Sequence, residues 1–573
     1  MSSKRTFFLR QGCGRQQGAA LMVMLVIMVI GVAAILVSVL SSSSLKIERD
    51  KTTADALAKA KTALIGYATS DPNYPGELPC PDVNDDGQLT MNVDYSGSSC
   101  ASPIGRLPWK TLGIPELRDG AGEHLWYAVA QNFWAMGTPT INSNTTGNLT
   151  VTDATNGTTV NNLVAIVFAP GSVLGGQDRS TTPANCTTTG SSSLAANMCA
   201  SNYLEGTNPA ATFNVFTAAS TGINTNYQTG AASSSFNDQG IYITHDQLLA
   251  PVETRIAREA KQCLDNYAAI SSNTNHRYPW AVPDTYTSQT GIHNTLFGRI
   301  AATPLTTTTS VDSTYALTML NALSSLQIAL NSYNANVNST TTAALLNAGN
   351  SLDTAAQNAA NYSSSSFYYY GSITSNAKSA ADNAQLLANG SGSSVSTIQV
   401  YINNTNSYLN SNGFIDGTMP IYWPSGCVFT SSSYWSAWQQ EVFYQVASGN
   451  SPGTSVSGCA NSCLSVTGSG NPNAGSGTYT AAVIVGRAYS TTLNSGSPTS
   501  NPPSYYLEGK NRDDGTGGSC SSPPIPGGKH DSTLNYGTCP KLSQTFETYR
   551  PTDPSYSSVN DLVVCLDGNN YCK

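Results

Sequence analysis

The most specific chemical pattern in the sequence is an acidic loop at residues 82–87 that reads Asp-Val-Asn-Asp-Asp-Gly. Oxygen-bearing side chains at its first, third and fifth positions are Asp82, Asn84 and Asp86, and the Gly that follows matches the opening of a calcium-binding loop. The acid expected at the twelfth position is missing, because that residue is Val93. Calcium is therefore the candidate cofactor, and a turn closed by its own Asp and Asn side chains is the alternative.

Cysteine is the second residue type that could do chemistry, and the chain has 13 of them. Pairs that are close in sequence are candidate disulfides, although connectivity cannot be read from sequence alone. These pairs are Cys80 with Cys100, Cys186 with Cys199, Cys459 with Cys463, and Cys565 with Cys572. Of the remaining five, Cys13 lies within the first 18 residues, and Cys263, Cys427, Cys520 and Cys539 could pair among themselves.

We found no sequence pattern that indicates catalysis, and we expect no enzyme. The motifs of zinc proteases, serine hydrolases and phosphate-binding loops are absent from the sequence. His245 and His530 each precede an Asp, and we interpret both as solvated side chains. The repeated Tyr-Leu-Glu-Gly segments around Glu205 and Glu508 are interpreted as structural turns that Gly permits.

An aromatic cluster follows a run of Ser at residues 363–366. Its members are Phe367, Tyr368, Tyr369 and Tyr370. Tyr combines an apolar ring with a hydroxyl, so the cluster is a candidate surface for a glycan, a solid surface or a partner protein. Packing of these rings against neighbouring helices is the alternative.

Composition excludes some functions. The 573 residues include 26 Lys and Arg against 34 Asp and Glu, and charged residues make up only 10% of the chain. This acidic balance argues against binding nucleic acid through phosphate neutralisation. The many Cys and the low charge indicate an oxidising, extracytoplasmic location.

The N-terminus predicts how the chain would reach that location. Four basic residues precede residues 19–40, which contain no charge and would span a bilayer as a helix. The helical spacing of apolar residues continues to about Thr69, and Asp71-Pro72 predicts its end.

The stretch Gln16-Gln17-Gly18-Ala19, between a basic leader and an apolar helix, resembles the signal of type IV pilins and type II secretion pseudopilins. The resemblance covers about residues 10–70. It implies cleavage after Gly18 by a prepilin peptidase, methylation of Ala19, and packing of the helix as a filament spine. It also implies an inner-membrane assembly platform as a partner, and calcium binding is known in this broad family.

One position departs from the family pattern. The fifth mature residue is usually Glu, whereas this chain has Val23. A buried carboxylate needs a partner, which the family is taken to find in the amine of a neighbouring subunit. A subunit with no earlier neighbour has no such partner. With Val23 in place of the Glu, this chain resembles the K-type and X-type subunits, which points to a place at the filament tip.

An internal repeat organises the rest of the chain. Tyr67-Ala68 returns as Tyr267-Ala268, Gly105-Arg106 returns as Gly298-Arg299, and the Tyr-Leu-Glu-Gly segment returns 303 residues later. The separation between repeated residues grows from 200 at Tyr67 to 303 at the Tyr-Leu-Glu-Gly segment. This increase places roughly 100–120 residues inside the second copy. Residues 304–412 are rich in Ala, Ser, Asn and Thr and show helical spacing of Leu, which predicts an inserted helical region.

The predicted fold is therefore α+β. A long N-terminal transmembrane spine helix would precede two related helix-plus-antiparallel-sheet heads, the second carrying a helical insert. The boundaries are a leader at 1–18, the spine at 19–70, the first head at 71–250, the second at 251–303 and 413–573, and the insert at 304–412.

The functional expectation is a minor pilin or pseudopilin, at the filament tip, that primes assembly and presents a large head for adhesion or partner contact. Its partners would be other pilins through the spine helix and a host, surface or secreted substrate through the head. We expect it in the bacterial inner membrane before assembly, with the head periplasmic, and then in an extracellular filament or a periplasmic pseudopilus. The alternative is a membrane-anchored exported enzyme or binding protein acting on an extracellular polymer.

Overall fold

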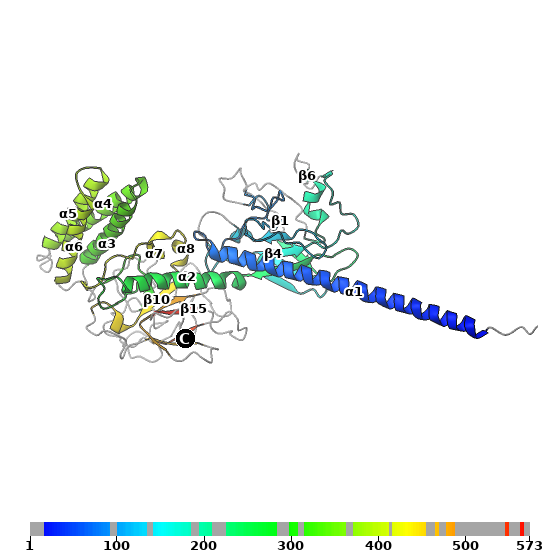
Figure 1. The fold of residues 1–573 in the computed structure, drawn as a ribbon. Helices are drawn as coiled ribbons and strands as arrows, with labels where there is room; N and C mark the ends of the chain where they lie inside the picture. Colours follow the sequence, from blue (N-terminus) through cyan, green and yellow to red (C-terminus); the bar gives the residue numbers. More distant parts are fainter. Residues whose placement is uncertain are drawn as a thin grey trace, which may run out of the picture.

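Helix α1 (Gln17–Ser70) has 54 residues, about 80 Å of helix, and its N-terminal half projects from the rest of the molecule (Figure 1). The computed structural model describes residues 17–91, 100–134, 141–184, 194–208, 225–282, 297–306, 314–361, 371–411, 415–453, 464–468, 477–486, 545–548 and 562–566. The helix ends at Ser70, and the carboxylate of the next residue, Asp71, accepts hydrogen bonds from the backbone N–H groups of Asn73 and Tyr74, both at 2.9 Å.

The expected transmembrane spine needs correction. Within the described ranges, no helix is both long enough and apolar enough to cross a membrane. Among the described side chains, the exposed large apolar ones in the N-terminal half of α1 are Met22 and residues 24–30. The predictions of a transmembrane spine helix and of an inner-membrane location are therefore wrong.

The first unit consists of the C-terminal half of α1 and a six-stranded sheet. Its strands are β1 (Ile104–Arg106), β2 (Trp126–Val129), β4 (Thr159–Ala169), β3 (Leu149–Asp153), β7 (Asn226–Thr229) and β8 (Gln239–Thr244). Strand β4 is central because it pairs antiparallel with β2, β3 and β8. Its second half is buried and apolar, as expected for a strand with a neighbour on each side.

The second unit begins with helix α2 (His245–Ala268), six residues earlier than the predicted start at 251. The Thr244 side chain accepts a hydrogen bond from the Gln247 N–H, and the Gln247 side chain accepts one from the Thr244 N–H. This capping box starts the helix, and Pro251 lies inside it rather than at its first turn.

The second unit places α2 on a four-stranded antiparallel sheet. In spatial order its strands are β9 (Phe297–Arg299), β10 (Val442–Val446), β13 (Ala481–Val485) and β15 (Leu562–Leu566). A three-stranded sheet of β12 (Gly477–Tyr479), β11 (Leu464–Gly468) and β14 (Thr545–Thr548) belongs to the same part of the chain.

The two units have the same strand arrangement. The order β1-β2-β4-β8 in the first corresponds to β9-β10-β13-β15 in the second. Gly105 faces Tyr127 across the first strand pair, and the repeated Gly298 faces Tyr444 in the second. In addition, the described side chains of α1 that are buried all have buried counterparts 200 positions later on α2. These residues are Thr53, Ala56, Leu57, Ala60, Leu64 and Ala68.

One hydrophobic core runs through both units, because α2 contacts both sheets. Leu248, Leu249 and Val252 near the start of α2 belong to the same cluster as Ile166 of β4 and Val483 of β13. The two units are therefore packed together rather than tethered by a linker.

The insert is a separate bundle of helices α3 (Thr314–Ala335), α4 (Ser339–Asn361), α5 (Gly371–Ala388) and α6 (Val395–Ser411). Figure 1 shows it beyond one end of α2, away from the projecting end of α1. It has its own core, in which Leu345 and Leu352 of α4 meet a row of small residues on α5: Ala377, Ala380, Ala381 and Ala384. These small side chains allow the helices to approach closely.

Candidate functional site

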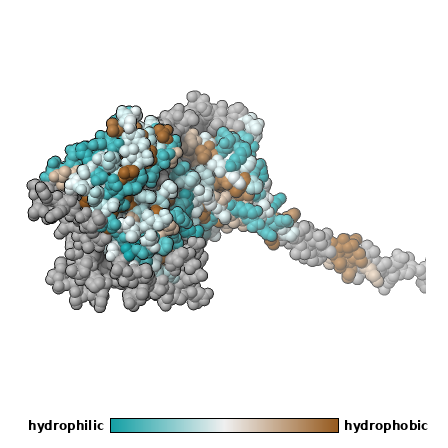
Figure 2. Space-filling model, turned by 60° about the vertical axis from the view of Figure 1, so that its left-hand side comes forward, coloured by the Kyte–Doolittle hydropathy of each residue, from teal (hydrophilic) through white to brown (hydrophobic). Residues whose placement is uncertain are grey.

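The candidate association surface is the apolar segment of α1, which we define as Met22 together with residues 24–30. Its side chains are 54–75% exposed. Figure 2 shows a brown, hydrophobic patch on the helix that projects from the head. A contiguous exposed apolar patch of this kind marks a surface that contacts a partner.

For several predicted site residues, the side chain or the whole residue lies outside the described part of the chain. Gly18, Ala19 and Val23 fall within the backbone range of α1, and their side chains are outside the described residues. The predicted surface-binding residues Phe367, Tyr368, Tyr369 and Tyr370 lie outside the described residues altogether.

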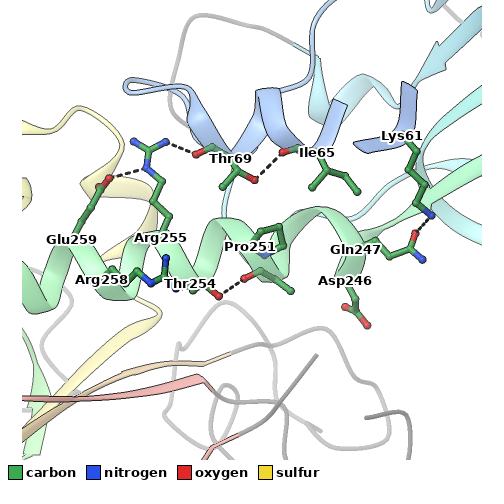
Figure 3. Close-up of a pocket in the computed structure, with 11 residues that line it drawn as sticks. Lys61, Ile65, Thr69, Asp246, Gln247, Pro251, Thr254, Arg255, Arg258 and Glu259 are labelled. Carbon is green, nitrogen blue, oxygen red and sulfur yellow. Dashed lines mark hydrogen bonds and ion pairs between the residues drawn. The ribbon is translucent and has the colours of Figure 1, made fainter. Parts of the chain in front are cut away.

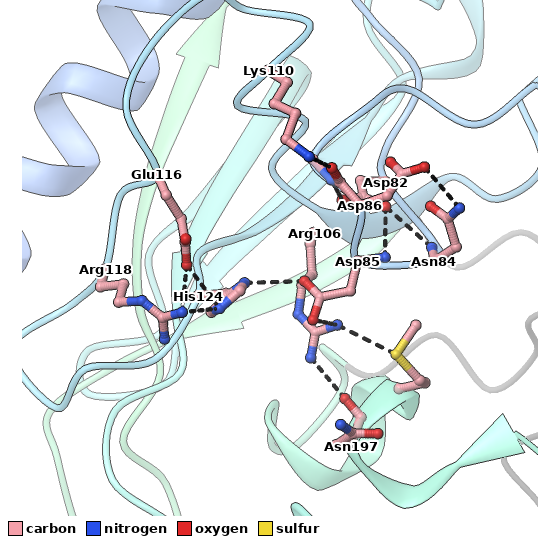
Figure 4. Close-up of polar contacts among 12 residues, drawn as sticks. Asp82, Asn84, Asp85, Asp86, Arg106, Lys110, Glu116, Arg118, His124 and Asn197 are labelled. Atoms are coloured by element: carbon pink, nitrogen blue, oxygen red, sulfur yellow. Dashed lines mark hydrogen bonds and ion pairs between the residues drawn. The ribbon is translucent and has the colours of Figure 1, made fainter. Parts of the chain in front are cut away.

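The acidic loop brings its predicted ligands together, but they bind one another (Figure 4). Buried Asp82 accepts backbone N–H groups at both oxygens: from Asn84 at 3.1 Å and Asp85 at 2.8 Å, and from Gly87 at 2.7 Å. Asn84 donates its side-chain amide to Asp86 at 3.0 Å. Gly87 has a φ of +83°, which suits glycine at this tight turn.

This geometry is that of a turn closed by its own Asp and Asn side chains. The oxygens of Asp82 are engaged by N–H donors, and Asn84 presents its amide nitrogen rather than its oxygen to Asp86. In the described part of the chain, no group of three or more His, Cys, Asp or Glu side chains could hold a metal ion. Burial raises the pKa of Asp82, although the N–H groups of Gly87, Asp85 and Asn84 act in the opposite direction.

A buried arginine that the sequence did not single out organises the loop. Arg106, 5% exposed, lies 3.3 Å from Asp85 and donates to the backbone oxygen of Asn197 at 2.7 Å. Its guanidinium also lies over the rings of Trp126 and Tyr203, at 5.3 and 5.2 Å from the ring centroids. The repetition of Gly105-Arg106 as Gly298-Arg299 was the available signal, because Arg299 is also buried and lies over Phe443.

Asp85 continues this network to the surface. Its second oxygen lies 3.0 Å from His124, whose other ring nitrogen lies 2.9 Å from Glu116 (Figure 4). Burial opposes ionisation of Asp85, but the hydrogen bond of His124 and the charges of Arg106 and His124 outweigh it and lower its pKa.

The Tyr-Leu-Glu-Gly segment of the first unit is held by a second acid, Asp238. Asp238 is fully buried and accepts hydrogen bonds from the Glu205 N–H and the Asn208 side chain, both at 2.8 Å. Glu205 in turn accepts the Asn237 N–H at 2.9 Å. Burial raises the pKa of Asp238 to about 8, against the opposing effect of the hydrogen bonds that Asn208 and the Glu205 N–H donate to it. The repeated Glu508 lies outside the described residues.

Helices α1 and α2 run side by side and enclose a groove of about 950 Å³ (Figure 3). Arg255 of α2 donates to the backbone oxygens of Thr69 at 2.7 Å and Asp71 at 2.5 Å, which the end of α1 leaves without helical partners. Lys61 of α1 donates to the Gln247 side chain at 2.7 Å, and burial lowers its pKa. These contacts fix the two helices in parallel.

The structure contains two described disulfides, Cys80–Cys100 and Cys263–Cys427. The first is one of the predicted sequence-near pairs, and the second ties α2 to helix α7 (Val428–Ser431). Cys199 and Cys565 are also disulfide-bonded. Their predicted partners, Cys186 and Cys572, and the predicted pair Cys459 and Cys463 lie outside the described residues.

Comparison with known proteins adds no family assignment, since no family model, curated protein or solved structure matches this chain.

Proposed function

We propose that this chain is a minor pilin or pseudopilin, a subunit that enters a filament through the apolar segment of α1. The observation that carries the proposal is the exposure of that segment on a helix projecting from the folded units (Figures 1 and 2). Packing against the equivalent helices of neighbouring subunits would remove this apolar area from water, which favours association.

The remainder of the molecule would form the head. The two units and the helical bundle present a large surface for adhesion or partner contact, at a distance from the association segment (Figure 1). The Val at position 23, where the family usually has Glu, supports a place at the filament tip and a role in priming assembly.

The test replaces Ile27, 64% exposed in the middle of the apolar segment, with Asp. Burying an unpaired carboxylate between helices is costly, so Ile27→Asp should weaken association by at least about a hundredfold. Sedimentation of the purified chain and electron microscopy of filaments measure this change.

The matched control is Ile47→Asp, because Ile47 is similarly exposed on the same helix, at 68%, but lies among charged residues outside the apolar segment. We expect this variant to associate like the unmodified chain. Equal association of the Ile27 variant and the unmodified chain would rule out the apolar segment as the assembly surface.

A further inference from the structure

A buried carboxyl lies at the joint where the second unit meets the first. Glu441, directly before β10, is fully buried. It meets a loop of the first unit: the Ser143 N–H donates to Glu441 Oε2 at 2.9 Å, and the Asn144 side-chain amide donates to Oε1. These partners are almost 300 residues apart in sequence, so the contact exists only when the units are packed together.

The hydrogen bonds of the joint can also be satisfied when Glu441 is neutral, although the Ser143 and Asn144 donors by themselves favour its ionised form. The Ser143 hydroxyl lies 2.6 Å from Glu441 Oε2 and 3.1 Å from the backbone oxygen of Gly486, which follows β13. A hydroxyl has one proton and cannot donate to both oxygens. If Glu441 is protonated, it donates to the Ser143 oxygen, and Ser143 donates to Gly486, so each oxygen has its partner.

No cation in the described residues forms an ion pair with Glu441. The titratable groups that face the joint come from α2. The negative charge of Glu253 opposes ionisation of Glu441, and the ring of buried His245 lies 3.0 Å from the Ser143 backbone oxygen and 3.1 Å from the Asp246 carboxylate. The loop and β13 contribute Ser143, Asn144 and Gly486, which do not titrate.

We propose that Glu441 is a proton-dependent clasp, which holds the second unit on the first when its carboxyl is neutral and releases the joint when it ionises. The clasp acts within one chain and does not depend on the proposed filament function.

The sign of the effect follows from burial, which raises the pKa of Glu441 to about 8, against 4.5 for a solvated Glu. The open joint exposes the carboxyl, which then ionises readily, so opening releases a proton. The clasp is therefore complete below about pH 4.5, weakens by up to about tenfold for each pH unit above that, and is weakest above pH 8.

Hydrogen exchange of the full chain tests the proposal. We expect the protection of peptides covering residues 141–147, corrected for the intrinsic pH dependence of exchange, to fall by up to about tenfold per pH unit between pH 5 and 8. In Glu441→Gln, which keeps a neutral side chain of the same shape, this protection should not change with pH. Glu48→Gln, at an exposed position on α1, is the control and should keep the slope of the unmodified chain.

A protection that stays constant with pH in the unmodified chain would overturn the clasp, as would an equal slope in Glu441→Gln. Should that variant fail to fold, carboxyl NMR of the unmodified chain with labelled Glu decides the matter. One Glu must then titrate near pH 8, and the titration of every Glu below pH 6 would reject the proposal.

Discussion

At the scale of single residues, Asp82 shows how a buried acid can serve the backbone of its own loop. Three N–H groups, from Asn84, Asp85 and Gly87, depend on its two oxygens. The spacing of acids that resembles a metal site therefore also serves to hold the loop, because backbone N–H groups donate to the carboxylate of Asp82. Arg106 extends the same arrangement by pairing with Asp85 and lying over the rings of Trp126 and Tyr203.

Replacing Asp82 with Ala should lower the free energy of unfolding by about 1–3 kcal/mol, because buried N–H groups lose their acceptor. Thermal unfolding of the purified chain measures this loss. Asp178→Ala is the control, since Asp178 accepts the Ser180 N–H in a similar but exposed turn, and its effect should be small.

The same measurement decides the question of calcium. Adding calcium or a chelator should leave the midpoint of unfolding unchanged in the unmodified chain. A rise in the midpoint with calcium that disappears in Asp82→Ala would show that the loop binds the ion after all.

At the scale of elements, the bundle enters and leaves the second unit at one place. The Asp416 N–H donates to the Thr306 backbone oxygen at 2.8 Å, so the two ends of the insert are adjacent. Buried Arg277 and Asp416 form an ion pair beside this point, and the Tyr267 hydroxyl donates to the Pro420 backbone oxygen. These contacts anchor both ends of the insert to the second unit, while the insert keeps its own core.

Excising residues 307–414 and joining Thr306 to Ile415 by Gly-Gly should leave both units folded and association through α1 intact. Ile415 and Ile421 belong to the bundle core and are changed to Ser in the same variant to avoid exposing them. Sedimentation, electron microscopy and a surface-attachment assay are the measurements. Lost attachment with intact filaments would support a role in adhesion, whereas lost filaments would make the bundle an assembly element.

At the scale of the whole molecule, the two halves of α1 differ: the C-terminal half packs against the folded units, and the N-terminal half exposes the apolar segment. Its described buried side chains begin at Thr53 and pack on the first unit, while the apolar segment lies far from the core. The helix continues into the folded units, where Arg255 and Lys61 hold its end against α2. A force applied to the projecting helix would therefore reach both units.

A chain that begins at Ser44 should fold with the same unfolding midpoint as the full chain and should fail to associate. The reason is that every described buried residue of α1 is retained, while the apolar segment is lost. Circular dichroism on heating and sedimentation provide the two readouts. A large drop in the midpoint would mean that residues before position 44 stabilise the head.

Local patterns allowed much of the architecture to be predicted. The spacing of Leu in the insert predicts helices where α3 and α4 lie, and Asp71-Pro72 marks the end of α1, because helical periodicity and chain termination depend on neighbouring residues. Helix α2 begins six residues before the predicted boundary at 251, because the capping box at Thr244 starts it and Pro251 is accommodated inside it.

The order of the elements, the repeat of the two units and the position of the insert follow from short-range spacing in the sequence. The folded arrangement decides which polar groups meet. It placed Ser143 against Glu441, buried His245 that the sequence suggested was solvated, and turned the oxygens of the acidic loop toward backbone donors. Such contacts depend on burial and on partners far apart in sequence, for which a single chain of residues carries no local pattern.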